Sequence, residues 1–368
     1  MQIECRQEHL ARALQIVGRM VGTRGTLPVL GNILLATDKG RLKVAATDLE
    51  LGVQTWIGGK VEDEGSLTVP ARLLIDFVVT NSDPIITLTV KDTTLHLQSE
   101  HHTASIKGIE ASEFPLIPAI KQTDGLIIKA QDLKEAVTQT IFATAIDETR
   151  PVLTGVLLRI EEETARLVAT DSYRLAERIL KLPGKHTPLQ VIVPARTFQE
   201  VARIITDPAA EISIFVTENQ VLFVVGETEL ISRLIDGIFP DYEQIIPKEV
   251  QTTISLERGS FAQVMKMASF FARESANNVQ LKASPGETAV AVTAISPQIG
   301  EDISRLSAII TGEAVEIAFN AKFILDALAI FPTEEINLEL AGKLTPGVLR
   351  MPKDSNYLYL IMPLRVDN

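Results

Sequence analysis

Apolar residues recur at helical spacing near the start of the chain. Leu10, Leu14 and Val17 fall on one face of a helix with a 3.6-residue repeat. Leu133 and Val137 occupy matching positions more than a hundred residues later. The pattern predicts three helices of this kind, over Glu8–Gly22, Ala130–Ala145 and Glu257–Arg273.

A second helix is predicted in each part of the chain. Pro70 and Pro194 suit its first turn, because the backbone N–H that proline lacks has no partner there. This set covers Ala71–Asn81, Ala195–Thr206 and Asn320–Phe331. Between the helices, apolar and polar residues alternate, as at Ile212, Ile214 and Val216, which is typical of strands. Two helices and about eight strands per part predict an α+β unit, with helices on one side of antiparallel sheet.

Short strings recur along the chain at one offset. Ala46-Thr47-Asp48 returns 123 residues later as Ala169-Thr170-Asp171, and Val69-Pro70-Ala71-Arg72 returns as Val193-Pro194-Ala195-Arg196. A fainter third copy has Phe319-Asn320-Ala321-Lys322 at the corresponding place. Such periodicity indicates a repeat architecture. We expect three similar domains, at 1–120, 121–247 and 248–368.

Charge is unevenly distributed between the helices and the rest of the chain. The 368 residues carry a formal net charge of −12, whereas the six predicted helices hold ten basic and seven acidic residues. This net charge argues against a protein that simply coats nucleic acid by neutralising phosphates, but it does not exclude a local basic surface. Arg72, Arg196 and Lys322 stand at the same place in the three copies, so the repeat predicts that they point toward one common surface.

Motifs for catalysis or cofactor binding are not found. The sequence has neither of the glycine-rich phosphate-binding motifs and no H-E-x-x-H, and its one cysteine cannot build a zinc cage. Asp48 and Asp171 repeat, but the third copy has Ala294, so a turn or capping role is favoured over acid catalysis. We therefore predict no enzyme activity, no cofactor and no metal.

The sequence also predicts where the protein works. Cys5 has no partner for a disulfide, which suits a reducing cytoplasm. The N-terminal segment carries Glu4 and Glu8 and has no apolar core run, unlike a signal peptide. No stretch approaches the 18 apolar residues of a membrane span, so a cytoplasmic protein without a membrane partner is expected.

The order and spacing of longer strings resemble one family over the full chain. The chain is similar to the bacterial sliding clamp, the β subunit of the replicative DNA polymerase III. The strings that carry the resemblance are Arg24-Gly25-Thr26-Leu27-Pro28-Val29-Leu30-Gly31-Asn32, Ala46-Thr47-Asp48-Leu49-Glu50, Val168-Ala169-Thr170-Asp171-Ser172-Tyr173-Arg174-Leu175-Ala176, Asp236-Gly237-Ile238-Phe239-Pro240-Asp241-Tyr242 and Tyr359-Leu360-Ile361-Met362-Pro363-Leu364-Arg365.

The resemblance implies a fold, an assembly and a function. The fold would be the DNA-clamp fold, with two chains joined head-to-tail in a closed ring and the helices lining its hole. The ring would encircle double-stranded DNA without sequence preference, slide along it and act as a processivity factor. Its partners would be the DNA polymerase III catalytic subunit, the clamp loader and other proteins with clamp-binding motifs. The alternative is a scaffold of three repeated domains that gathers partner peptides and does not bind DNA.

The family's partner-peptide pocket, carried over position by position, gives a set of candidate residues. They are Leu153, Thr170, Ser172, Tyr173, Arg174, Leu175, Pro240, Gln244, Ile245, Phe323, Leu344, Leu360, Met362, Pro363, Leu364 and Arg365. Apolar members would anchor a peptide, and Arg174 or Arg365 would orient it. Tyr173 and Gln244 stand where the family often has histidine and arginine.

Two further surfaces follow from the same resemblance. The DNA-facing candidates are Arg24, Arg72, Arg150, Arg196, Arg203, Lys266 and Lys322. The dimer contact is expected at Phe270 and Phe271, because two adjacent aromatic residues of a helix cannot both face one core. The receiving edge is expected at the strands near Thr94–Gln98.

Overall fold

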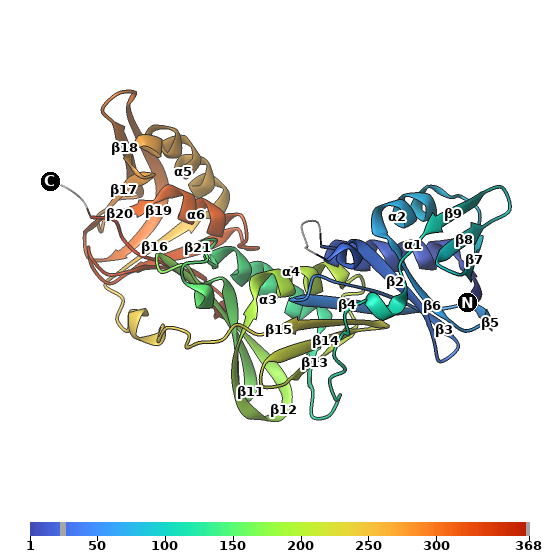
Figure 1. Ribbon diagram of the computed structural model, residues 1–368. Coiled ribbons are helices and arrows are strands. Elements are labelled where there is room, and N and C mark those ends of the chain that lie inside the picture. Colours follow the sequence, from blue (N-terminus) through green and yellow to red (C-terminus); the bar gives the residue numbers. More distant parts are fainter. Residues whose placement is uncertain (23–26, 366–368) are drawn as a thin grey trace. The chain divides into compact units, whose positions relative to one another are not determined.

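The computed structural model describes residues 1–22 and 27–365. The chain divides into two compact units, Met1–Gln131 with Gln199–Leu234 and Asp132–Phe198 with Ile235–Asn368 (Figure 1). The middle repeat contributes to both units.

All six predicted helices are confirmed within the described residues. They are α1 (Gln7–Val17), α2 (Ala71–Thr80), α3 (Ala130–Thr140), α4 (Ala195–Ile204), α5 (Arg258–Ala272) and α6 (Ala321–Leu328). Several end earlier than predicted, because the chain tightens into 3₁₀ turns at Gly18–Met20 and Ile141–Ala143. Glu257 and Asn320, predicted as first residues, instead cap α5 and α6 with their side chains.

The first unit contains two antiparallel sheets. One has the order β5 (Lys60–Asp63), β1 (Gln2–Arg6), β7 (Ile85–Lys91), β8 (Thr94–Gln98), β9 (Thr103–Lys107). The other has the order β10 (Leu126–Lys129), β13 (Glu211–Val216), β14 (Gln220–Val225), β15 (Thr228–Arg233), β4 (Leu51–Gly58), β3 (Arg41–Thr47), β2 (Asn32–Asp38), β6 (Ser66–Pro70). The predicted apolar face of α1, including Leu10, Leu14 and Val17, is buried, and α1 packs against β3, β4 and α2.

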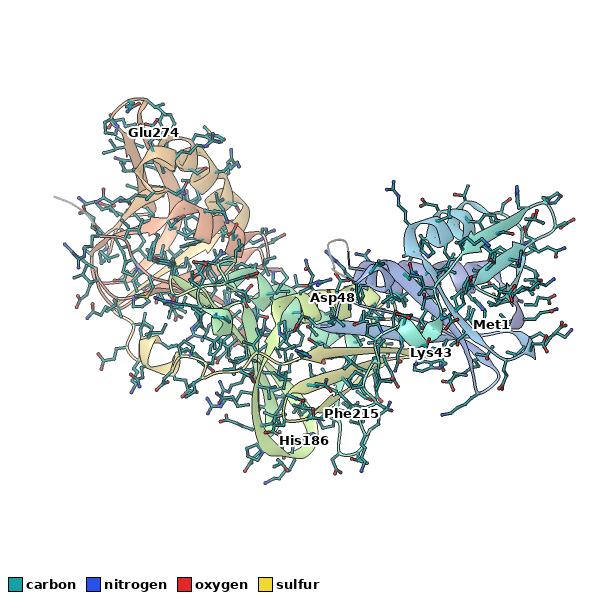
Figure 2. All side chains as sticks on the ribbon, in the orientation of Figure 1. Met1, Lys43, Asp48, His186, Phe215 and Glu274 are labelled. Atoms are coloured by element: carbon teal, nitrogen blue, oxygen red, sulfur yellow. The ribbon has the colours of Figure 1, made fainter. Side chains whose placement is uncertain are left out.

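The second unit has one ten-stranded sheet. Its order is β11 (Gly155–Thr170), β12 (Arg174–Pro194), β23 (Asp354–Ile361), β22 (Gly347–Met351), β21 (Glu335–Leu340), β16 (Thr252–Glu257), β19 (Gly300–Gly312), β18 (Ala289–Ser296), β17 (Asn278–Ala283), β20 (Val315–Asn320). Helix α5 packs against β16 to β19 and against α6 (Figure 1). The register of β11 and β12 shifts on either side of Glu162, which pairs with His186 on β12. Figure 2 labels His186 near the far end of this long hairpin.

Strand number differs from the expected eight in two repeats. The described residues form nine strands in the first repeat, six in the second and eight in the third. The second has fewer because β11 and β12 are continuous over 16 and 21 residues. Within the described ranges, none of the helices has the length and apolar character needed to cross a bilayer.

The repeats are joined by the same strand pairing at both internal junctions. In the first unit, β4 pairs with β15, with Leu51 opposite Ser232. In the second unit, β12 pairs with β23, with Arg174 opposite Ile361. Each joint unites the second strand of one repeat's β-hairpin with the last strand of the next repeat.

The single tryptophan lies in the first unit. Trp56 on β4 donates a hydrogen bond from Nε1 to Asp38 Oδ2 at 2.7 Å. The Lys43 ammonium lies 5.6 Å from the ring centroid and the Arg41 guanidinium 5.9 Å from it. Both are within cation–π range, so the indole is enclosed by charged partners.

Candidate functional site

A tight turn joins β11 to β12 at the centre of the predicted peptide site. The Thr170 hydroxyl donates to the Arg174 carbonyl at 2.7 Å and accepts from the Ser172 N–H at 3.1 Å. Asp171 Oδ1 accepts from the N–H groups of Tyr173 and Arg174, each at 3.0 Å. The predicted structural use of Asp171 is confirmed. Its hydrogen bonds fix the backbone positions of Tyr173 and Arg174.

The first unit repeats this turn at the equivalent position. The Thr47 hydroxyl donates to the Leu51 carbonyl, and Asp48 Oδ1 accepts from the N–H groups of Glu50 and Leu51. Leu49 has the same backbone φ of 79° as its counterpart Ser172. The repeat found in the sequence is therefore also a repeat of local geometry.

Arg174 is the most heavily partnered side chain of the site. Its side chain is 8% exposed, and its guanidinium pairs with Asp171 Oδ2 at 2.9 Å and Asp326 Oδ2 at 2.7 Å. The guanidinium lies 4.6 Å from the ring centroid of Phe323 and 5.6 Å from that of Phe142. Two carboxylates and two aromatic faces thus compensate a charge that has left water.

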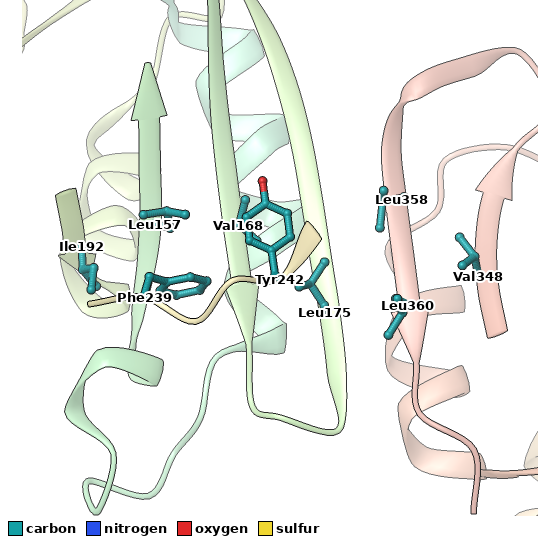
Figure 3. Close-up of a cluster of buried hydrophobic side chains, with 9 residues drawn as sticks. All are labelled: Leu157, Val168, Leu175, Ile192, Phe239, Tyr242, Val348, Leu358 and Leu360. Atoms are coloured by element: carbon teal, nitrogen blue, oxygen red, sulfur yellow. The ribbon is translucent and has the colours of Figure 1, made fainter. Parts of the chain in front are cut away.

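Buried side chains of β11, β12, β22, β23 and the segment after β15 form an apolar cluster (Figure 3). Leu175 on β12 and Leu360 on β23 are fully buried in it, and Met362 packs against it partly exposed. Tyr242 belongs to the same cluster and donates its hydroxyl to Glu177 at 2.6 Å. Burial, together with Glu177, raises the pKa of Tyr242 above its ordinary value. This bond fastens the chain that follows Phe239 onto β12.

The predicted pocket residues fall into two groups by exposure. Leu153, Thr170, Arg174, Leu175 and Leu360 are buried. Ser172, Tyr173, Pro240, Gln244, Ile245, Phe323, Leu344, Met362, Pro363, Leu364 and Arg365 are partly or fully exposed. A peptide would therefore touch the second group, whose members the first group supports.

Several contacts connect the exposed group. Tyr173 is 63% exposed, and its ring stacks with Phe323 at a centroid distance of 6.5 Å. The Met362 N–H donates to the Tyr173 carbonyl at 2.8 Å. The Gln244 amide donates to Asp241, so it is held within its own turn.

Sequence reasoning missed three residues here. Phe142 and Asp326 contact Arg174, and Ile246, rather than Ile245, packs against the apolar cluster. Only Asp326 left a signal in the sequence, because it stands four residues after Lys322 and so on the same helical face.

The basic residues repeated on the second helices occupy equivalent positions. Arg72, Arg196 and Lys322 are each the second residue of α2, α4 and α6, and all three are exposed. The Arg72 side chain is 96% exposed. A cation in the first turn is unfavourable for the helix dipole, so helix stability does not explain its repetition.

The other DNA-facing candidates have more varied settings. Arg203 pairs with Glu200 on α4, and the Lys266 ammonium lies 5.6 Å from the Phe270 ring centroid on α5. Arg150 is outside any helix and donates to the Ser172 hydroxyl at 3.1 Å, beside the peptide-site turn. Arg24 lies outside the described residues.

The predicted dimer residues are on α5, which packs against β18 and β19, and part of β19 has only one strand partner. Phe270 is 41% exposed near the end of α5, while Phe271 is half-buried. In β19, residues 300–307 pair with β18 alone, and β16 joins only from residue 308 onward. Ile295, Ile299 and Ile303 are exposed on this hairpin. An open strand edge with apolar neighbours is typical of an interaction surface.

The strands near Thr94–Gln98 include one open sheet edge, but Thr94–Gln98 itself is not that edge. It is β8, which lies between β7 and β9, so the open edge is β9. The short β9 sequence, Thr103–Lys107, alternates weakly between apolar and polar residues, which is why the pattern did not reveal it.

One group of possible metal ligands occurs among the described residues. Atoms of Asp83, Glu100 and His101 lie within 4.8 Å of one another. Asp83 accepts from the Ser99 hydroxyl at 2.6 Å and from the His101 backbone N–H at 2.9 Å, and its other oxygen lies 2.7 Å from His101 Nδ1. These bonds hold the pKa of Asp83 below its usual range. Mutual hydrogen bonding accounts for the group, and nothing about it requires an ion.

Comparison with known proteins covers the whole chain. Models of the DNA polymerase III beta subunit match over its N-terminal domain at residues 1–118, its central domain at 127–241 and its C-terminal domain at 243–365. This chain belongs to the DNA polymerase III beta subunit family.

Individual members of the family agree over their full length. The beta sliding clamp of Synechococcus elongatus is 33% identical over 375 residues, with all of both chains covered. That of Staphylococcus aureus is 31% identical, with 99% of both covered. The crystal structure of the Bacillus subtilis DNA polymerase sliding clamp has a TM-score of 0.95 at 30% identity, again with full coverage.

Membership in the beta subunit family fixes the fold and the class of function. The three-domain sliding-clamp fold is confirmed. The family consists of non-catalytic processivity factors, so the chain is not an enzyme, and the interpretation as a scaffold without DNA is not favoured.

Proposed function

We propose that two copies of the chain close head-to-tail into a ring around double-stranded DNA. The clamp domains would be residues 1–120, 121–247 and 248–368 of each copy. The ring would work in the cytoplasm and tether the DNA polymerase III catalytic subunit, the clamp loader and other proteins that carry a clamp-binding motif.

The observation that carries the proposal is the pairing of strands at the internal junctions. Both joints use the second strand of a hairpin, β4 or β12, and the last strand of the next repeat, β15 or β23. In the third repeat, the second strand of the hairpin is β19, and in the first repeat the last strand is β9. Neither takes part in an internal junction, and both have an open edge. Pairing β19 of one copy with β9 of another would make the same joint a third time, and two such joints close a ring.

The open part of β19 is net acidic and β9 is basic. Glu301, Asp302 and Arg305 lie in the open part of β19, while Lys107 ends β9. Phe270 and the exposed isoleucines of the β18–β19 hairpin would supply apolar area to the same contact. Complementary charge would orient the strands, and apolar burial would supply most of the affinity.

The DNA-facing surface is proposed from the three repeated cations. Arg72, Arg196 and Lys322 lie in the first turn of α2, α4 and α6, where backbone N–H groups also attract anions. Arg24, Arg150, Arg203 and Lys266 complete the proposed set. Contacts of this kind bind phosphates without reading bases.

The peptide site is proposed at the turn between β11 and β12 and the end of β23. Tyr173, Ile245, Leu344, Met362 and Pro363 offer exposed apolar surface above the buried cluster of Figure 3. A short linear motif with one or two large apolar side chains fits such a surface.

Retention on DNA of different topology tests the ring. Protein loaded by a clamp loader onto nicked circular plasmid should remain through gel filtration and dissociate once a restriction enzyme linearises the plasmid. Topology rather than affinity would hold it there. Equal loss from circular and linear DNA at moderate salt would contradict encirclement.

A further inference from the structure

One carboxylate is shared by the two binding surfaces proposed above. Asp326 Oδ2 accepts from Arg174 Nη1 at 2.7 Å and from Lys322 Nζ at 2.9 Å. Lys322 is 63% exposed and belongs to the DNA-facing set, whereas the largely buried Arg174 belongs to the peptide site. Two cations from different surfaces therefore compete for one oxygen atom.

We propose that Asp326 couples DNA binding to peptide binding. When a DNA phosphate takes the Lys322 ammonium, Asp326 holds Arg174 more firmly, and the clamp binds its partner peptide more tightly. This inference rests on the proposed function, which supplies both ligands.

Electrostatics gives the direction of the coupling. While Lys322 is in place, it neutralises part of the Asp326 charge and adds a like charge near the Arg174 guanidinium. Its departure to a phosphate leaves Asp326 with Arg174, so the remaining charge-assisted hydrogen bond strengthens. Asp326 is only partly exposed, so solvent screens this effect incompletely.

Arg174 transmits the effect to the peptide site through its aromatic neighbours. Its guanidinium lies over Phe323, and Phe323 stacks with the exposed ring of Tyr173. The Tyr359 hydroxyl donates to the Phe323 carbonyl at 2.9 Å, which fastens α6 to β23. A firmly held Arg174 therefore keeps the rings of Phe323 and Tyr173 in place. Side chains that are already ordered lose less entropy when a peptide binds.

The coupling must act in both directions. A peptide that fixes Arg174 against Asp326 also releases Lys322 to bind phosphate. The affinity for peptide and the affinity for DNA are linked by one coupling free energy, so each ligand raises the affinity for the other by the same factor. Asp326 is thus a positioning residue for both surfaces. Partners would bind preferentially to clamps that already carry DNA.

Peptide titrations on the full-length wild type and three variants test the proposal. A fluorescent synthetic peptide with a clamp-binding motif is titrated into wild type, K322Q, D326N and the double variant K322Q/D326N. We expect K322Q to bind peptide roughly fivefold more tightly than wild type in the absence of DNA, at the low end of typical coupling. D326N should bind more weakly than wild type, and K322Q should have no further effect in the D326N background.

The matched control is K282Q. Lys282 is also an exposed lysine of the third repeat that pairs with a carboxylate, but it lies on β17, pairs with Glu316 rather than Asp326, and belongs to neither proposed binding surface. Its replacement should leave peptide affinity unchanged. A tighter K322Q also separates coupling from structural damage, because damage would weaken binding.

Loaded clamps supply the second measurement. On nicked circular plasmid, wild type should gain roughly fivefold in peptide affinity, whereas K322Q and D326N should gain nothing. Equal affinities of wild type, K322Q and K282Q, or a K322Q effect that persists with D326N, would overturn the coupling while the peptide site stands. Failure of wild type to bind peptide would instead overturn the proposed site, and the coupling with it.

Discussion

At the scale of single residues, burial decides which chemistry is available. Cys5 lies on β1 and is 3% exposed. Burial, and to a smaller extent the nearby charge of Glu4, raises the pKa of its thiol to about 12. The thiolate is the reactive form of cysteine, so the folded protein suppresses the reactivity of its one thiol.

Alkylation should therefore report unfolding. Iodoacetamide at pH 9 should leave Cys5 of the native protein unmodified, although an ordinary thiol is largely ionised there, and should modify it fully in denaturant. Mass spectrometry measures the difference. Because the folded pKa is raised, the stability contribution of this thiol is complete below pH 8 and declines as the pH rises toward 12. Rapid labelling of native protein at pH 9 would show that β1 opens locally.

Residue roles differed in how far the sequence could predict them. Asp48 and Asp171 were recognisable as turn residues, because each accepts hydrogen bonds from the backbone N–H groups two and three residues later in the chain. The contacts of Arg174 could not be predicted from the sequence. Phe142 and Asp326 are far from Arg174 along the chain and contact it only because of tertiary packing. The buried state of Leu175 and Leu360 likewise depends on the pairing of β12 with β23.

At the scale of elements, the free strand edges carry most of the information about assembly. Helix positions followed from periodicity, and so did most strands. The sheet order did not, because a strand such as β9 is recognised by what it pairs with rather than by its own composition. The edge of β19 is similarly visible only once its partners β18 and β16 are known.

Charging the α5 contact should separate the subunits. Phe270→Glu with Phe271→Glu removes two aromatic side chains, each worth about 1.5–3 kcal/mol when buried, and adds negative charge to the side of the proposed contact that already carries Glu301 and Asp302. Dimer dissociation should rise by at least about a hundredfold, as measured by sedimentation velocity over a concentration series.

A matched control addresses exposed apolar residues in general. Ile146 lies in the exposed loop after α3 and belongs to neither β9 nor the β18–β19 hairpin, so Ile146→Glu should leave the dimer intact. An unchanged dimer in the Phe270/Phe271 double variant would place the subunit contact elsewhere.

The end of β23 allows a similar test of the peptide site. Met362→Ala removes an apolar side chain that is partly exposed beside Leu360 and should weaken peptide binding roughly tenfold, which fluorescence anisotropy would show. Point substitution is preferable to deleting residues 362–368, because the N–H groups of Met362 and Leu364 hold Tyr173 and Ala318 by backbone bonds. Undiminished affinity would argue that the motif binds away from β23.

At the scale of the whole molecule, local positive charge and closure of the proposed ring would both contribute to retention on DNA. The chain has a net charge of −12, so any attraction for phosphate must be local, at helices that carry more basic than acidic residues. A closed ring needs little affinity to remain attached. Weak, salt-sensitive contacts are then sufficient, and they leave the ring free to slide.

Neutralising the repeated cations should change that salt sensitivity. Arg72→Gln, Arg196→Gln and Lys322→Gln together remove up to six phosphate contacts per dimer, so the slope of log affinity against log salt should become shallower by about 5 for a short linear duplex. Fluorescence anisotropy over a salt series measures the slope.

The control for this variant keeps the same change in net charge. Lys39→Gln, Lys185→Gln and Lys353→Gln alter exposed turn or strand lysines, one in each repeat, and should leave the slope unchanged. Equal slopes for both triple variants would remove Arg72, Arg196 and Lys322 from the DNA-facing surface.

The placement of the aromatic chromophores makes the two compact units separately visible to spectroscopy. Trp56, enclosed by Asp38, Lys43 and Arg41, is the only tryptophan and belongs to the first unit. All four tyrosines, at positions 173, 242, 357 and 359, belong to the second. Indole emission and phenol absorbance in one denaturation experiment would therefore reveal whether the two compact units unfold together or one after the other, without any added label.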